Sequence, residues 1–207
     1  MTAKAVVFDI GNVLVTWQPE AFFDREIGAD RRVAMFSETG ILLLNEEIDN
    51  GAPFRASVEG LARRHPQWEA ELMLWRDRWT DLVLPVIDGS VALLRALKAK
   101  GVPVFALTNF GSETFVTAQE VFPFLREFDR AWVSADLRVM KPDPRIYQIL
   151  ETDSGLSGPD LIFTDDKAEN IQAAAARGWQ THLFTGWQGW ARRLVEDGFL
   201  TKQEAGL

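Results

Sequence analysis

Five short apolar segments lie along the chain, and residues typical of turns bound each of them. They span residues 5–8, 102–107, 131–134, 161–164 and 181–184. Most are continuously apolar rather than alternating, which is typical of strands buried on both faces. The stretches between them carry apolar residues at helical spacing. The pattern therefore predicts an α/β fold, with a parallel sheet and helices on both of its faces.

Two of the intervening helices are predicted with definite limits, and a third helix is predicted in the tail. Ser90 precedes an apolar stripe in residues 91–100 and Gly101 follows it, which predicts a helix capped by Ser90 and stopped by the glycine. A second helix is predicted over residues 168–177, closed by Gly178. The tail after Thr185 predicts one more short helix.

The interval from Trp17 to about Pro85 contains no strand-like segment. Its apolar spacing is helical in four stretches, residues 19–27, 30–48, 57–64 and 66–84. An unstructured loop of this length is implausible inside a compact domain. The sequence therefore predicts an inserted α-helical cap over residues 17–85 and a Rossmann-like catalytic core formed by residues 1–16 and 86–207.

Three tryptophans, Trp68, Trp75 and Trp79, recur at helical spacing within this interval. We interpret them as the packing core of a small helical bundle. Direct contact with a substrate is the alternative reading.

The composition narrows the functional classes. The chain has 207 residues, of which 47% are hydrophobic and 25% charged, as in ordinary globular proteins. Its apolar runs are too short to cross a bilayer, no segment resembles a signal peptide, and cysteine is absent, so we expect a cytoplasmic protein. A net charge of −8 argues against nucleic acid as a partner. A small molecule is the expected partner, and the oligomeric state cannot be read from the sequence.

Polar side chains stand at the ends of the predicted strands. Ligands of open parallel sheets bind at the carboxyl ends of the strands. The residues found there are Asp9 after the first strand, Thr108 and Asn109 after the second, Lys141 beyond the third, and Asp165 and Asp166 after the fourth, with Asn170 one helical turn later. Each alone fits an ordinary turn, cap or surface role. Their joint occurrence at successive strand ends favours a site.

The chemistry of such a site is coherent. Crowded carboxylates repel one another, and a hard divalent cation such as Mg²⁺ relieves that repulsion. Asp9 can act as a nucleophile that accepts a phosphoryl group. Lys141 would stabilise charge on Asp9 and on the transferring group, while Thr108 and the backbone around Asn109 would bind phosphoryl oxygens. Gly11 would let the backbone turn sharply and direct its carbonyl toward the metal.

Four segments resemble, in order, the motifs of the haloacid dehalogenase-like hydrolase superfamily. They are FDIGNVLV at residues 8–15, ALTN at 106–109, MKPDPRIY at 140–147 and FTDDKAEN at 163–170. The helical interval falls where the C1-type cap of that family is inserted, so the resemblance covers nearly the whole chain. It implies that Asp9 is the nucleophile, that Thr108 and Lys141 bind the phosphoryl group, that Asn170 orients the fourth-motif loop, and that Asp9, Asp165, Asp166 and the carbonyl of Gly11 hold Mg²⁺.

One position departs from the family pattern. Most phosphatases of the superfamily carry a second aspartate two residues after the nucleophile, which protonates the leaving alcohol and later activates water. Gly11 stands there, and a missing general acid/base typically costs about 10²–10⁴ in rate. The variant resembles a branch that includes bacterial α-glucose-1-phosphatases, which implies that it is compatible with hydrolysis. Glu46, Glu47 and Asp49 are candidate substitutes, each also readable as a solvated helix or turn residue.

Three functions follow from these residues. The first is a Mg²⁺-dependent phosphatase acting on a small phosphorylated metabolite, with a sugar phosphate as one candidate. The second is a haloacid dehalogenase, in which Asp9 attacks carbon without a metal; the pair Asp165–Asp166 argues against it, because that fourth motif usually lacks two acids. The third is a non-catalytic binder of phosphorylated ligands, which would have no need of a nucleophile.

Overall fold

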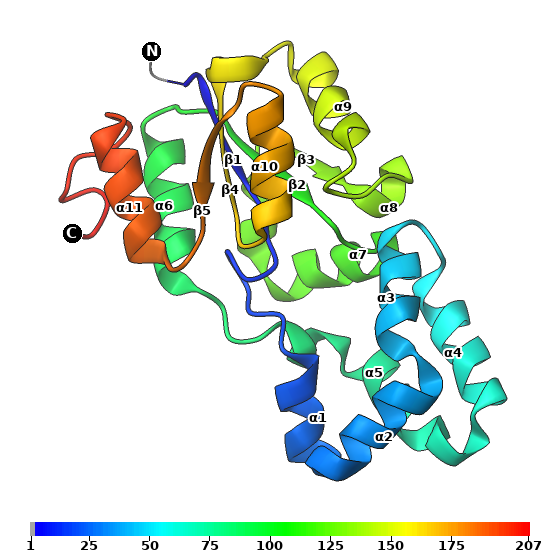
Figure 1. The fold of residues 1–207 in the computed structure, drawn as a ribbon. Helices are drawn as coiled ribbons and strands as arrows, with labels where there is room; N and C mark the ends of the chain where they lie inside the picture. The colour runs from blue at the N-terminus through cyan, green and yellow to red at the C-terminus, as the bar shows by residue number, and fades with distance from the viewer. Residues whose placement is uncertain (1–2) are drawn as a thin grey trace.

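The computed structural model describes residues 3–207 and contains a five-stranded parallel sheet in the order β3-β2-β1-β4-β5 (Figure 1). Its strands are β1 (Ala5–Phe8), β2 (Val104–Thr108), β3 (Arg130–Val133), β4 (Leu161–Asp165) and β5 (Gln180–Leu183). The first strand is central, with Val6 opposite Val104 on one side and Ile162 on the other. The predicted parallel α/β fold is confirmed.

The second strand begins two residues later than predicted. Val102, which was expected to open it, instead donates its backbone N–H to the carbonyl of Leu97 at 3.1 Å. This bond keeps Val102 attached to the end of the preceding helix. The apolar character of Val102 misplaced the boundary, because apolar character alone does not distinguish a helix terminus from a strand start.

Alternate residues of the central strands β2, β1 and β4 pack into two separate apolar clusters. Val6 and Phe8 of β1 face the cluster that includes α6 (Asp88–Ala99) and α11 (Trp187–Glu196). Ala5 and Val7 face the cluster that includes α9 (Pro144–Ser154) and α10 (Ala168–Ala176). Figure 1 shows these two helix pairs on opposite sides of the sheet. Both faces of the sheet are thus covered, as the continuous apolar strands require.

The remaining helices of this part are short or lie at the rim. They are α7 (Ser112–Val121), the 3-10 helix Pro123–Arg126, α8 (Ser134–Leu137) and the 3-10 helix Gly158–Asp160. Helices over 88–99, 168–176 and 187–196 agree with the three predicted helices. The assignment of Ser90 as a cap is wrong. Helix α6 already begins at Asp88, and Ser90 is fully buried inside it.

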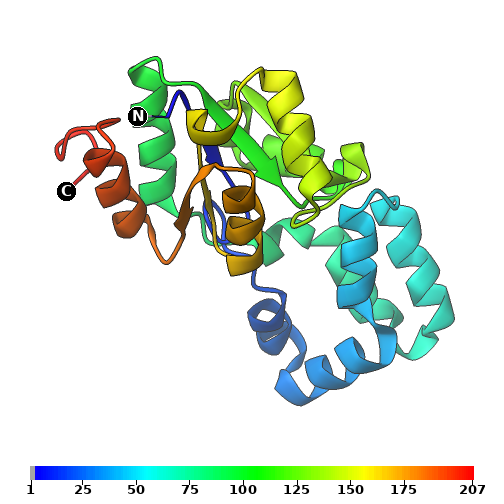
Figure 2. The same ribbon diagram turned by 45° about the horizontal axis from the view of Figure 1, so that its top comes forward.

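Every secondary-structure element that the structure describes between β1 and α6 is a helix. They are α1 (Pro19–Ile27), α2 (Ala29–Thr39), α3 (Ile41–Asp49), α4 (Phe54–Arg64), the 3-10 helix Pro66–Trp68, α5 (Glu69–Asp77) and the 3-10 helix Trp79–Val83. The predicted helix over 30–48 is divided at Gly40, whose φ of 65° ends α2. Figures 1 and 2 show α1 to α5 gathered beside the carboxyl ends of the strands. The division into a core and a cap stays a prediction.

Aromatic packing holds these helices together. Trp75 is fully buried and stacks on Phe23 with ring centroids 5.8 Å apart. Trp68 and Trp79 are also buried, and Trp79 packs edge-on against Phe110 at 5.3 Å. The interpretation of the three tryptophans as packing residues agrees with this burial. Trp79 alone among them also lines the cavity described below.

Two backbone segments connect the sheet with the helical interval, and they run side by side. Thr16 donates its N–H to the carbonyl of Pro85 at 3.0 Å, and Ile87 donates to Leu14 at 2.8 Å. Val15 and Val86 form an antiparallel bridge between them. The two connections therefore form a short hydrogen-bonded ribbon.

In the part of the chain that the structure describes, no helix is long and apolar enough to cross a membrane.

Candidate active site

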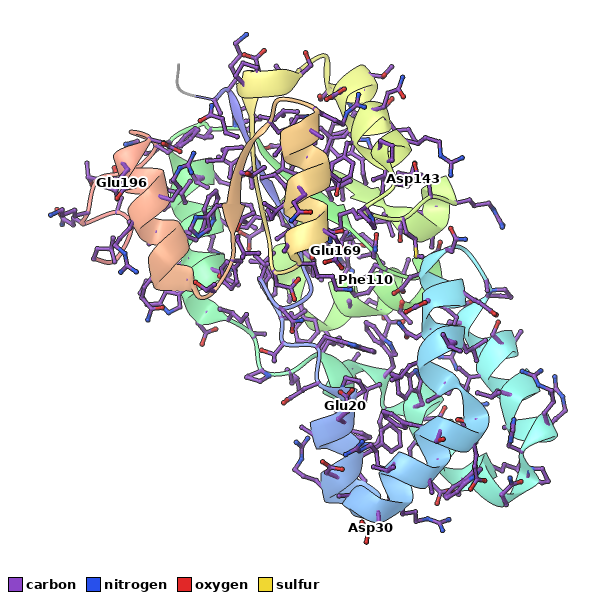
Figure 3. All side chains as sticks on the ribbon, viewed as in Figure 1. Glu20, Asp30, Phe110, Asp143, Glu169 and Glu196 are labelled. Atoms are coloured by element: carbon purple, nitrogen blue, oxygen red, sulfur yellow. The ribbon has the colours of Figure 1, made fainter. Side chains whose placement is uncertain are left out.

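A cavity of about 490 Å³ lies where the strand ends meet the helical interval. On the sheet side its lining includes Asp9, Gly11, Asn12, Asn109, Phe110, Lys141, Asp166, Lys167 and Asn170, and on the helical side Trp17, Glu20, Leu42, Asn45, Glu46, Asp49, Trp79 and Val83. Figure 3 labels Phe110 below the sheet and Glu20 at the start of α1, one from each side. All but two of the predicted site residues, Thr108 and Asp165, line this cavity.

Asp9 ends the central strand and is nearly buried, with 7% of its surface exposed. Its Oδ1 accepts the backbone N–H of Ile10 at 2.7 Å and lies 2.8 Å from Nζ of Lys141. Burial raises the pKa of Asp9 to about 7, and the neighbouring carboxylates of Asp165 and Asp166 add to that rise while Lys141 opposes it. A cation bound among these acids would favour the ionised form that a nucleophile needs.

Lys141 places its ammonium group at the centre of the acids. Nζ lies 2.8 Å from Asp9, 2.7 Å from Asp165, and donates to the carbonyl of Leu107 at 2.8 Å. Burial alone would lower the pKa of Lys141, but the two carboxylates outweigh burial and the pKa is raised. The three donors of the ammonium are all used. Lys141 is therefore held charged and in one position.

Asn109 fixes the backbone that carries this lysine. Its Nδ2 donates to the carbonyl of Lys141 at 3.0 Å, and its Oδ1 accepts the N–H of Lys141 at 2.8 Å. Thr108, at the end of β2, behaves differently. Its Oγ1 is buried and has no hydrogen-bond partner among the described residues, and Thr108 does not line the cavity. An unpaired buried hydroxyl is costly. The role of Thr108 as a phosphoryl ligand stays a prediction.

Asp165 is the last residue of β4 and Asp166 follows it, and the two have different surroundings. Asp165 is fully buried and accepts two bonds from Nδ2 of Asn170, at 2.9 and 3.0 Å, and one from the backbone N–H of Lys167 at 2.8 Å. Asp166 is half-buried and accepts from Nδ2 of Asn12 at 2.9 Å. Two hydrogen bonds from Asn170 thus hold the carboxylate of Asp165 at the start of the fourth-motif loop, and the orienting role of Asn170 stays a prediction.

The donor set of this cluster fits a hard divalent cation. Asp9, Asp165 and Asp166 each offer a carboxylate oxygen, and these oxygens lie within 4.8 Å of one another. Lys141 forms ion pairs with Asp9 and Asp165, while Asp166 is paired with the neutral amide of Asn12, so the three carboxylates carry more charge than the lysine offsets. Oxygen-only donors with excess negative charge are what Mg²⁺ prefers. The residues present therefore fit the metal that the sequence predicted.

In the turn that follows Asp9, the left-handed conformation falls on Asn12, with φ 54°, and not on Gly11, whose place beside the metal stays a prediction. Asparagine tolerates this left-handed conformation better than most residues. The Asn12 side chain also accepts the N–H of Trp17 at 3.0 Å while it donates to Asp166. A Cβ built at Gly11 would meet nothing within 4 Å. The amide in FDIGNV was visible in the sequence, but its partners were not.

The three candidate acids of the helical interval separate clearly. Glu46 and Glu47 are exposed, and Glu47 does not line the cavity. Asp49 is half-buried and does line it. Lys167, which sequence reasoning left without a role, lines the same cavity and attracts the Asp49 carboxylate.

Comparison with known proteins gives a consistent picture. The family model described as haloacid dehalogenase-like hydrolase matches residues 3–178. The sesquiterpene phosphatase of Aspergillus oryzae is 30% identical over 178 residues, which cover 86% of this chain and 87% of that protein. The D-ribitol-5-phosphate phosphatase of Bacteroides thetaiotaomicron is 25% identical over 93% of this chain and 97% of that protein.

Among solved structures, the magnesium complex of a HAD family enzyme from Bacteroides thetaiotaomicron superposes with a TM-score of 0.74. The superposition covers 94% of this chain and 99% of that chain at 19% identity. Likeness at this identity shows that the two proteins share a fold.

Proposed function

Since the chain belongs to the haloacid dehalogenase-like hydrolase family, we propose that this hydrolase cleaves a small phosphomonoester through a covalent phosphoryl group on Asp9. The observation that carries the proposal is the position of Asp9. Its carboxylate lies at the floor of a cavity of about 490 Å³, 2.8 Å from the ammonium of Lys141. A nearly buried carboxylate paired with a buried lysine is suited to attack a phosphorus atom.

In the first step a carboxylate oxygen of Asp9 forms a bond to phosphorus, and the bond between phosphorus and the alcohol oxygen breaks. Lys141 neutralises charge on Asp9 before the attack and on the phosphoryl oxygens during it. In the second step water attacks the phosphoryl group, the bond to Asp9 breaks, and inorganic phosphate leaves. Asn109 acts indirectly, because its side chain fixes the backbone of Lys141.

We assign the metal site to Asp9, Asp165, Asp166 and the carbonyl of Gly11. A bound Mg²⁺ would offset the mutual repulsion of these groups and of the dianionic phosphate. Asp165 also anchors Lys141, whose Nζ lies 2.7 Å away, and Asn170 holds Asp165 in place. The lysine and the metal ligands therefore depend on a shared carboxylate.

The helices over residues 17–85 act as a cap that selects the alcohol portion of the substrate. Their contribution to the cavity mixes apolar residues, such as Leu42 and Trp79, with polar ones, such as Asn45. The two relatives act on different phosphorylated compounds according to their names. We propose a small phosphomonoester of a metabolite, with a sugar phosphate as one candidate.

The test is phosphate release from p-nitrophenyl phosphate, measured with Mg²⁺ and with EDTA. We expect release that needs the metal and that the substitution Asp9→Asn lowers by at least about 10⁴-fold. Beryllium fluoride with Mg²⁺ should stabilise the wild type against thermal unfolding and leave Asp9→Asn unaffected. Halide release from 2-haloacids in the presence of EDTA would instead establish a dehalogenase. Binding of phosphorylated ligands without turnover would establish a binder.

A further inference from the structure

We propose that Asp49, at the end of helix α3, is the general acid and base of the reaction and replaces the carboxylate that is missing at Gly11. This inference rests on the proposed function. Asp49 and Asp9 line the same cavity from opposite sides, one from the helical interval and one from the sheet. When a phosphomonoester is bound at Asp9, its leaving alcohol must occupy this cavity. A proton donor in the lining of the cavity is therefore suitably placed.

The end of α3 is anchored to the sheet side. The hydroxyl of Ser134 donates to the backbone carbonyl of Asp49 at 2.5 Å and accepts the N–H of Phe110 at 2.9 Å. The approach is close, because a Cβ added to Gly111 would lie 2.6 Å from Ile48. A carboxylate at this point of the chain therefore has a defined position relative to the strand ends.

The surroundings of the Asp49 side chain suit proton transfer near neutral pH. Burial raises the pKa of Asp49 to about 7; Lys167 and the backbone N–H of Gly111 oppose that rise, and Glu46 and Asp9 add to it. Its carboxylate also accepts a bond from Nδ2 of Asn45 at 3.2 Å, and forms no salt bridge among the described residues. A carboxyl group that exists in both forms near pH 7 can both donate and accept a proton.

No other acid of the helical interval combines these properties. Glu20 and Glu46 line the cavity but are exposed, so water solvates their carboxylates. Glu47, two residues before Asp49, is exposed and does not line the cavity. Substitution of Glu47 is therefore the matched control, because it removes a negative charge from α3 without removing a group that lines the cavity.

The protons balance over the cycle. As the bond between phosphorus and the alcohol oxygen breaks, the protonated Asp49 gives its proton to that oxygen, and a neutral alcohol leaves. Asp49 is then ionised and takes a proton from the water that attacks the phosphoryl group on Asp9. Phosphate leaves, Asp9 is regenerated as the carboxylate, and Asp49 is protonated again.

Two probes of different leaving-group quality test the assignment. p-Nitrophenolate leaves readily without a proton, whereas the alkoxide of n-hexyl phosphate needs one. For Asp49→Asn we expect kcat on n-hexyl phosphate to fall by about 10²–10³. With p-nitrophenyl phosphate the first step should be almost unimpaired, but hydrolysis of the phosphoryl group on Asp9 should slow. A rapid burst of p-nitrophenol equal to the enzyme concentration should then precede slow turnover.

Glu47→Gln should behave as the wild type on both probes, and Asp49→Glu should recover part of the lost rate on n-hexyl phosphate. A structural role for Asp49 would instead lower the rates on both probes by the same factor and give no burst. That result, or wild-type rates for Asp49→Asn, would overturn the inference while leaving the proposed function intact. Wild-type protein that releases no phosphate from either probe would remove both.

Discussion

The two walls of the cavity differ in how firmly their charges are held. The strand-end wall includes Asp9, Lys141 and Asp166, and its carboxylates are bound to the lysine at 2.8 Å or to the amide of Asn12 at 2.9 Å. The helical wall, which includes Leu42 and Trp79, carries three carboxylates without a salt bridge among the described residues, those of Glu20, Glu46 and Asp49. One wall is rigid and electrostatically paired, and the other is loosely paired.

This difference assigns different work to each wall. Paired buried charges keep a nucleophile and its lysine in fixed geometry, which any phosphomonoester requires. Groups on the helical wall contact the remainder of the substrate, and their charges can change during the cycle. Substitutions on the strand-end wall should therefore affect every substrate equally. Those on the helical wall should discriminate between substrates, and the predictions below test this division.

The largest effect should come from Lys141→Met. It leaves Asp9 and Asp165 buried without their ammonium group, which costs about 3–5 kcal/mol in free energy of unfolding. Activity should fall by about 10³ on every phosphomonoester. Urea denaturation in EDTA and assays on two substrates measure both losses. Lys98→Met, which removes the exposed pair with Asp129, should cost less than about 1 kcal/mol. Equal losses in the two variants would contradict the division.

The next effect concerns Gly11→Asp in the Asp49→Asn background. A Cβ at Gly11 meets no atom within 4 Å, so the new side chain has room. If the helical wall supplies the proton in the wild type, an acid placed on the strand-end wall should recover at least about tenfold of the rate on n-hexyl phosphate. Steady-state kinetics measures the recovery. A double variant as slow as Asp49→Asn would show that the position is unsuited to proton transfer.

The pH profile should give a smaller but distinctive effect. The pKa of Asp49 is raised to about 7, so the protonated form that donates to an alkoxide is lost as pH rises through 7. We expect kcat/KM of the wild type on n-hexyl phosphate to decrease up to about tenfold per pH unit above that value. Asp49→Asn should lack this decrease. Its persistence in the variant would assign the decrease to another group.

The smallest effect should come from Leu42→Ala. Leu42 lines the cavity and is 38% exposed, so its truncation should change the free energy of unfolding by less than about 1 kcal/mol. We expect KM to change by less than about tenfold, and by different factors for n-hexyl phosphate and a sugar phosphate, with little change in kcat. Leu43→Ala, on the same helix and outside the cavity lining, is the control. Identical KM shifts for both substrates would deny selectivity to the helical wall.

The fold could be predicted from the sequence because strands buried on both faces leave an unbroken apolar signal. Where the apolar pattern misplaced a strand boundary, a local hydrogen bond was the reason. At Val102 the backbone N–H stays bonded to the carbonyl of Leu97, so the strand begins later than predicted. The prediction that Ser90 caps a helix was wrong for a related reason, since a residue that can cap a helix can also be buried inside one. Boundaries depend on such single contacts, whereas the existence of an element depends on many residues.

The residues of the strand-end wall could likewise be predicted, because parallel strands bring their carboxyl ends to one edge of the sheet and these residues follow the predicted strands. The position of Asp49 could not. The bond that anchors it joins residues 85 apart in sequence, Asp49 and Ser134. Asn12 was equally hidden, since its link to Asp166 spans 154 positions. No local pattern encodes contacts between segments that only the folded chain brings together.

The two paired connections at residues 14–18 and 82–87 have a mechanical consequence. Two backbones joined by hydrogen bonds bend together more easily than they shear, so we expect them to act as a hinge with one axis. Once the bond from Ser134 to the carbonyl of Asp49 breaks, helices α1 to α5 would swing about this hinge as a unit and carry Asp49 away from the strand ends. Asp49 would then reach the leaving alcohol only when the helices are closed over the strand ends, so cleavage of the phosphorus–oxygen bond would require closure.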